Sequence, residues 1–202
     1  AAGVDVITTG NHVWKKREMV PYLMGERRVV RPLNYPGEAP GFGWVLTKKN
    51  GMEICVANVE GRVFMNALDC PFRALDRLLD QVDRRVPVIV DFHAEATAEK
   101  IALGYYLDGR VSALLGTHTH VQTADETILP GGTGYITDVG MTGPSDSVIG
   151  MDKVAVLAKF VTQIPHKFEV AKNDNEVQGV LLTIDGESRA CLSIQRIKER
   201  VE

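Results

Sequence analysis

Four of the five histidines lie in three short segments, and each segment follows an apolar run. The segments end in Asn11-His12, in His93 and in the His-x-His of residues 118–120. Imidazole nitrogens and amide oxygens bind transition-metal ions, and a mixture of the two suits Mn²⁺, iron or Zn²⁺. If the three segments meet in space, the sequence predicts a metal cluster.

Each of these residues also has a structural interpretation when it is taken alone. His118 and His120 are also consistent with two surface or hydrogen-bonded histidines, and His93 with a buried histidine whose own hydrogen-bonding groups have partners. Asn11 has the position of a cap for the helix that follows it. The metal hypothesis gains weight because three such motifs in one small domain are hard to assign to three unrelated packing roles.

Other polar residues near these motifs have open roles. Asp91 either orients a neighbouring imidazole or is an ordinary strand-end carboxylate. Glu95 and Glu99 are interpreted as acidic residues at the start of a helix, where the helix dipole favours them. His166 stands outside any motif and is expected at the surface.

The elements that must position the histidines read as alternating strands and helices. Residues 4–8, 88–92 and 111–115 are expected to be buried strands, and residues 97–107 a helix between the last two. A helix of about a dozen residues is expected to open at Pro71. This alternation favours an α/β fold, in which binding sites lie at the carboxyl ends of the strands.

The rest of the chain is expected to complete this fold. Asn50-Gly51 separates two strand-like runs, 44–47 and 52–58, and predicts a hairpin. Residues 138–147 form a long glycine-containing loop that we expect either beside the site or in a structural role. The further expected elements are helices at 15–25 and 151–163 and strands at 127–129, 134–137, 167–170, 177–184 and 190–197.

Composition limits the class of protein. The chain has 202 residues, 45% of them hydrophobic, which is enough for one core of ordinary domain size. A net charge of −3 gives no electrostatic footprint for a stable nucleic-acid partner. No apolar stretch reaches the length of a membrane span, and we expect no membrane partner. The three widely spaced cysteines predict reduced thiols in a cytoplasmic protein.

The motifs together carry a family resemblance. Gly-Asn-His at residues 10–12 and Gly-Thr-His-Thr-His at residues 116–120 resemble the motifs of calcineurin-like metallophosphoesterases. The wider segments 9–14, 91–97, 116–125 and 137–144 resemble the YmdB family of bacterial phosphodiesterases. The resemblance covers essentially the whole chain.

The resemblance implies a calcineurin-like metallophosphoesterase fold of the α/β class, with a two-sheet β core flanked by helices. It also implies a cytoplasmic hydrolase that acts on cyclic nucleotides or similar phosphodiesters through two metal ions. By motif, Asn11, His93 and His118 would bind one ion and His120 the other, while His12 would protonate the leaving oxygen. Iron or manganese is the favoured metal, with zinc and magnesium as alternatives.

The chain departs from the family pattern at its beginning. The family has an upstream strand–helix–strand unit whose Asp and Gly-Glu-Asn supply the remaining ligands, and no residue here matches them. We therefore expect residues 1–202 to be a single metallophosphoesterase domain without this unit. Two other hypotheses stay open: a non-catalytic regulatory or scaffold relative that binds metal or nucleotide, and a mononuclear zinc hydrolase using His93, His118 and His120. A homo-oligomer is also left open.

Overall fold

The computed structural model describes residues 3–49 and 51–201, and its main element is a six-stranded sheet of order β3-β4-β5-β6-β8-β7. Its strands are β3 (Trp44–Lys49), β4 (Met52–Glu60), β5 (Val88–His93), β6 (Ala113–Thr117), β7 (Thr127–Ile128) and β8 (Gly134–Ile136). Strands β4, β5, β6 and β8 run parallel to one another. Their carboxyl ends therefore lie along one edge of the sheet.

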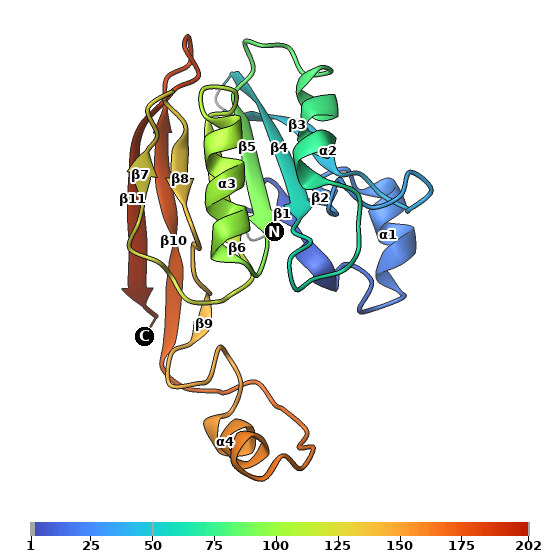
Figure 1. The fold of residues 1–202 in the computed structure, drawn as a ribbon, viewed down its shortest axis with the longest axis vertical. Helices are drawn as coiled ribbons and strands as arrows, with labels where there is room; N and C mark the ends of the chain where they lie inside the picture. The colour runs from blue at the N-terminus through green and yellow to red at the C-terminus, as the bar shows by residue number, and fades with distance from the viewer. Residues whose placement is uncertain (1–2, 50, 202) are drawn as a thin grey trace.

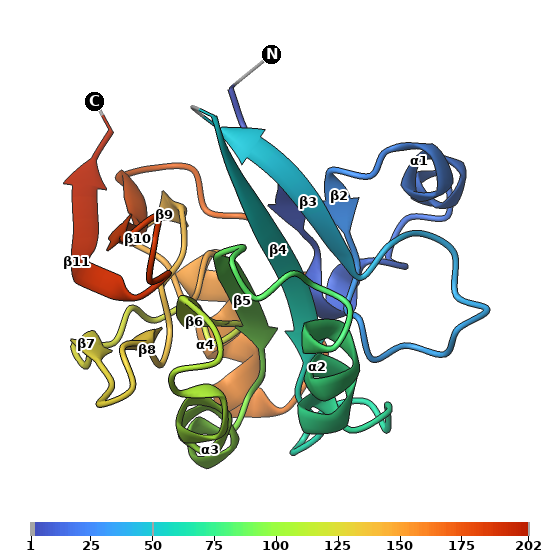
Figure 2. The same ribbon diagram turned by 90° about the horizontal axis from the view of Figure 1, so that it is seen from above.

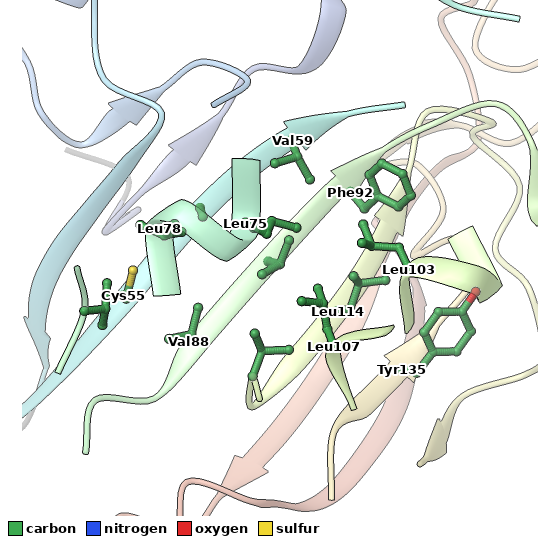
Figure 3. Close-up of a cluster of buried hydrophobic side chains, with 14 of the residues drawn as sticks. Cys55, Val59, Leu75, Leu78, Val88, Phe92, Leu103, Leu107, Leu114 and Tyr135 are labelled. Atoms are coloured by element: carbon green, nitrogen blue, oxygen red, sulfur yellow. The ribbon is translucent and has the colours of Figure 1, made fainter. Parts of the chain in front are cut away.

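Two helices, α2 (Pro71–Leu79) and α3 (Thr97–Leu107), cover the same face of this sheet (Figure 1). Figure 3 shows the core between them, where leucines of both helices lie against Val88 and Phe92 of β5. Side chains alternate along a strand, so Asp91 and His93 point to the face opposite these core residues. The alternating pattern of β5 thus places Asp91 and His93 on the face of the sheet that the helices do not cover.

Two smaller sheets complete the architecture (Figure 2). The parallel pair β1 (Ile7–Thr8) and β2 (Val29–Val30) belongs to the N-terminal region, which also holds the 3₁₀ helix η1 (Gly10–His12) and α1 (Met19–Gly25). Strands β9 (Gly143–Pro144), β10 (Asn175–Ile184) and β11 (Cys191–Arg200) form an antiparallel sheet. Helix α4 (Lys153–Thr162) lies apart from the main sheet (Figure 1).

Most of the predicted elements are confirmed. The helix at 97–107 has the predicted bounds, and the chain is of the α/β class. β3 and β4 pair antiparallel as the hairpin prediction requires, although Asn50 itself lies outside the described residues. The C-terminal strands β10 and β11 also pair antiparallel, extending the predicted ranges by a few residues. All three cysteines are free thiols, as predicted.

Several predictions about the ends of the elements are wrong. The buried strand expected at 4–8 is a two-residue edge strand whose Ile7 is 50% exposed, because among the described residues it pairs with the short β2 alone. The helix expected at 15–25 begins at Met19, which places Pro21 in the first turn, where its missing N–H leaves no hydrogen bond unmade. Helix α2 has nine residues rather than a dozen.

Two further corrections concern the region around α4. Helix α4 begins at Lys153 rather than at residue 151, because the Asp152 carboxylate accepts hydrogen bonds from the backbone N–H groups of Val154 and Ala155 and caps the helix. The strand expected at 167–170 is not formed, and Val170 makes only an isolated bridge to Met151. Among the described residues, no helix has both the length and the apolar content to cross a bilayer.

Candidate active site

Three of the predicted metal ligands meet at the carboxyl edge of the main sheet. Asn11 lies in η1, His93 ends β5, and His118 follows β6. The Nε2 atom of His93 lies 3.1 Å from Asn11 Oδ1 and 3.1 Å from His118 Nδ1. Segments far apart in the sequence therefore place three polar atoms around one point.

The hydrogen bonds of His93 fix which of its nitrogens carries the proton. The Thr117 hydroxyl donates its single hydrogen to Asp91 Oδ1 at 2.7 Å. It must then accept from Nδ1–H of His93, which lies 3.0 Å away. Burial lowers the pKa of His93 to about 3, so the ring is neutral at pH 7 and Nε2 carries a lone pair.

The environment of His118 leads to the same result. Its Nε2 lies 3.2 Å from the Glu95 carboxylate, which accepts a hydrogen bond from Nε2–H and leaves Nδ1 as the lone-pair atom. The pKa of His118 is lowered, mainly by burial, so this ring also tends to be neutral. Asn11 Oδ1, His93 Nε2 and His118 Nδ1 are thus three acceptors that face one another without a proton between them.

A bound cation would make this arrangement of three acceptors favourable. Three lone pairs facing one another repel, whereas a bound metal ion uses all three. Two atoms bonded to one ion at 2.0–2.2 Å lie about 3.0–3.5 Å apart, which matches the observed separations around His93 Nε2. The residues present therefore fit one divalent ion with mixed nitrogen and oxygen ligands.

The amide of Asn11 is essential to this set. Within residues 3–49 and 51–201, no group of three or more His, Cys, Asp or Glu side chains could hold a metal ion. The three-histidine zinc site considered from the sequence is therefore not formed in this arrangement. His120 is turned elsewhere, with its Nδ1 donating to the backbone oxygen of Ile149 at 3.0 Å. That contact leaves the Nε2 atom of His120 as its free acceptor.

A chain of hydrogen bonds behind His93 holds the site in place. Asp91 accepts from Thr117 and, through Oδ2, from Asn58 Nδ2 at 3.1 Å. The other amide atom of Asn58, Oδ1, accepts from the backbone N–H of Gly10 at 3.1 Å. Burial raises the pKa of Asp91 to about 6, which still leaves it ionised at pH 7. Asp91 thus orients the imidazole of His93, but through Thr117 rather than directly.

Replacing Thr117 with valine tests this chain. The substitution keeps the shape of the side chain but removes the hydroxyl that joins His93 Nδ1 to Asp91. Because outer partners of metal-binding histidines typically contribute 10- to 100-fold to metal affinity, we expect the dissociation constant for Mn²⁺ to rise by about that factor. Isothermal titration calorimetry measures it. Unchanged affinity would show that the Thr117 bridge is not needed to orient His93.

The backbone around the two later histidines is strained. His118 has φ of 101° and His120 has φ of 65°, values that non-glycine residues seldom adopt. Such conformations persist only where the surrounding structure imposes them, and they are concentrated at functional sites. His12 is exposed in η1, and its pKa is lowered by partial burial and then by the charges of Lys15 and His120. His166 is exposed, as predicted.

Sequence reasoning missed several residues of the site. Glu95 precedes α3 and reaches His118 instead of decorating the helix, whereas Glu99 lies in the first turn and accepts from the backbone N–H groups of Arg62 and Val63. Asn58 and Thr117 gave no signal beyond their positions near strand ends.

Lys100 was also missed, although its spacing carried a signal. It lies at the i position of the buried i, i+3, i+4, i+7 stripe of α3, whose other members are Leu103, Gly104 and Leu107. A lysine in such a stripe requires a buried partner. Its partner is Asp138, the first residue of the loop predicted at 138–147. Asp138 also accepts from Thr119, between His118 and His120, so the start of that loop lies against the site.

Comparison with known protein families shows which family this chain belongs to. The family model of the YmdB-like proteins matches residues 1–197. The chain belongs to the YmdB-like family. The fold is therefore the calcineurin-like type of α/β phosphoesterase that the motifs indicated, and the YmdB-like match extends over nearly the whole chain.

Three relatives of this YmdB-like protein are informative. It is 49% identical over 197 residues to the 2′,3′-cyclic-nucleotide 2′-phosphodiesterase of Bacillus subtilis strain 168, covering 97% of this chain and 75% of that protein. A hypothetical protein from Thermus thermophilus has a crystal structure with a TM-score of 0.93 and 47% identity, covering 98% and 77% of the two chains. The crystal structure of a novel phosphatase from Mycoplasma pneumoniae has a TM-score of 0.91 and 35% identity, and the match covers 98% of this chain and 73% of that one.

Proposed function

We propose that this YmdB-like protein is a metal-dependent phosphodiesterase that hydrolyses cyclic nucleotides or similar phosphodiesters. The observation that carries the proposal is the convergence of three unprotonated acceptors, Asn11 Oδ1, His93 Nε2 and His118 Nδ1. The Bacillus relative named as a cyclic-nucleotide phosphodiesterase supports the substrate class. A small, anionic phosphodiester is the partner we propose, in a cytoplasmic setting.

The proposed metal centre has two ions. Asn11, His93 and His118 would bind the first, and the free Nε2 of His120 would be a ligand of the second. Iron or manganese suits these nitrogen and oxygen donors best, with zinc or magnesium as alternatives. When bound, the ions supply Lewis-acid stabilisation of the charge on the phosphoryl oxygens.

His12 is proposed as the proton donor to the leaving oxygen. It follows Asn11 in η1 and lies close enough to His120 for their charges to interact. In the free protein its lowered pKa favours the neutral ring, and an anionic phosphodiester beside it acts in the opposite direction by stabilising the imidazolium. A larger fraction of His12 would thus carry the proton that it donates when substrate is bound.

Hydrolysis assays test the function. Purified protein should hydrolyse bis-p-nitrophenyl phosphate and 2′,3′-cyclic AMP with added Mn²⁺, and EDTA should abolish the activity. Elemental analysis should find transition metal in the active protein. Metal binding without turnover of either substrate would favour the alternative, a non-catalytic regulatory or scaffold relative.

Replacing His12 with alanine tests its role separately. Because His12 is proposed to transfer a proton and not to bind metal, turnover should fall by on the order of 10²–10⁴-fold while metal content stays at the wild-type value. Steady-state kinetics and elemental analysis of the same sample provide both values. Loss of metal in this variant would contradict the assignment and make His12 a ligand.

A further inference from the structure

A fully buried ion pair lies beneath the two strained histidines. Nζ of Lys100, on α3, donates to Oδ2 of Asp138 at 2.9 Å, and both side chains are 0% exposed. Asp138 follows β8, two residues beyond its last residue. Neither residue is a proposed metal ligand. Burying two charges carries a large desolvation penalty, so a contribution to folding stability does not by itself explain why this pair is present.

The carboxylate of Asp138 joins two turns at the edge of the site. Its Oδ2 also accepts from the backbone N–H of Thr119 at 3.0 Å and from the Thr119 hydroxyl at 2.7 Å. Its Oδ1 accepts from the backbone N–H of Gly140 at 2.9 Å. One side chain therefore fixes the turn after β6 and the start of the loop after β8.

Thr119 is the residue between the two strained histidines. With His118 at φ of 101° and His120 at φ of 65°, the turn has an unfavourable backbone conformation that persists only where surrounding contacts impose it. The double contact from Thr119 to Asp138 is a restraint at the centre of that turn. Only an ionised carboxylate can accept all four donors, and Lys100 balances its charge in the core.

We propose that Lys100 and Asp138 are positioning residues that hold the His118-Thr119-His120 turn in its metal-binding conformation. This inference rests on the proposed function, because it assigns the pair a role only if the turn binds metal. The pair acts through Thr119 and touches neither the ions nor the substrate. Its contribution is a turn that is already in place before an ion arrives.

A double variant separates positioning from stability. Asp138→Asn alone strands the Lys100 charge and presents an amide N–H₂ group to the donors of Thr119, so it should lower the melting temperature. Lys100→Met together with Asp138→Asn removes both buried charges, and neutral replacement of a buried ion pair is often tolerated. We expect its melting temperature to recover relative to Asp138→Asn, while the Mn²⁺ dissociation constant stays about 10- to 100-fold above the wild-type value.

Two further variants keep the test decisive. Thr119→Ala leaves the ion pair intact but removes one contact to Asp138, so it should weaken Mn²⁺ binding several-fold even if the double variant fails to fold. Leu103→Ala, on the same buried face of α3, is the control: it should lower the melting temperature through a cavity and leave Mn²⁺ affinity unchanged. Isothermal titration calorimetry with Mn²⁺ and thermal unfolding provide the two readouts.

The outcomes distinguish the two proposals. Wild-type Mn²⁺ affinity in both the double variant and Thr119→Ala would overturn the positioning role and leave the proposed function intact. A wild-type protein that binds no Mn²⁺ would overturn the proposed function, and the positioning role with it. Equal loss of affinity in Leu103→Ala would show that general destabilisation, not the turn, controls metal binding.

Discussion

Replacing Gly10 with alanine is expected to remove metal binding and activity. Gly10 has φ of +57°, and a Cβ atom built on it would lie 2.5 Å from the ring of His93. Moving the ring aside would break its contacts, because Nδ1 is held by Thr117 and Nε2 faces Asn11 and His118. We expect the Mn²⁺ dissociation constant to rise by at least about 100-fold. Overpacking should cost about 1–3 kcal/mol in the free energy of unfolding.

Gly51→Ala is the matched control for this variant. Gly51 also has a positive φ, +83°, but apart from its chain neighbours no atom of the described residues lies within 4 Å of a Cβ atom built there. Gly51→Ala should therefore lower the free energy of unfolding through the same kind of unfavourable backbone conformation, but without a collision with His93. Titration calorimetry and urea unfolding of both variants measure the difference. If Gly10→Ala binds Mn²⁺ as tightly as Gly51→Ala, the close approach of Gly10 to His93 is not required.

Replacing Gly116 with alanine should have the largest effect on folding. Gly116 lies in β6, and a Cβ atom there would lie 1.7 Å from the backbone oxygen of Thr137, just beyond β8. Backbone atoms cannot rotate away, so the two segments must separate. The separation would also displace Thr117 and Asp138. We expect a loss of more than about 4 kcal/mol in the free energy of unfolding, measured by urea denaturation.

Gly179→Ala is the control for Gly116. Gly179 also lies in a strand, β10, and within residues 3–49 and 51–201 no atom beyond its chain neighbours lies within 4 Å of its Cβ position. Its substitution should change the free energy of unfolding by less than about 1 kcal/mol. A Gly116→Ala protein as stable as Gly179→Ala would mean that β6 and the segment after β8 are further apart in solution than they are here.

The parts of the fold that could be predicted are those with a long and regular sequence signal. Helix α3 has such a signal, and so does β5, whose apolar run is uninterrupted except at Asp91. Strand β1 shows why other parts could not. It consists of two residues, and Ile7 pairs with Val29 only because the intervening helix brings that residue back. A strand of this length is defined by its partner and not by its own residues.

The same distinction holds within the site. The convergence of Asn11, His93 and His118 could be predicted because such motifs are rare and short, whereas their binding of metal stays a prediction. The roles of Thr117 and Asn58 depend on which side chains the sheet places beside them, and Thr117 bonds to residues 24 and 26 positions away along the chain. No local pattern encodes such contacts. Lys100 is the intermediate case, since its position on an apolar stripe signals a buried partner without identifying it.

The distances along the chain between the three proposed metal ligands have a consequence for the lifetime of the protein. Asn11 and His93 are 82 positions apart, and His93 and His118 are 25 apart. An ion shared by all three would close two long loops and act as a reversible cross-link, in the way that a disulfide restrains the unfolded chain. At a free ion concentration of 100 times the dissociation constant, binding would add about 2.7 kcal/mol to the free energy of unfolding. The supply of metal would then govern resistance to proteolysis, and the cell would retain this protein for longest when it is loaded.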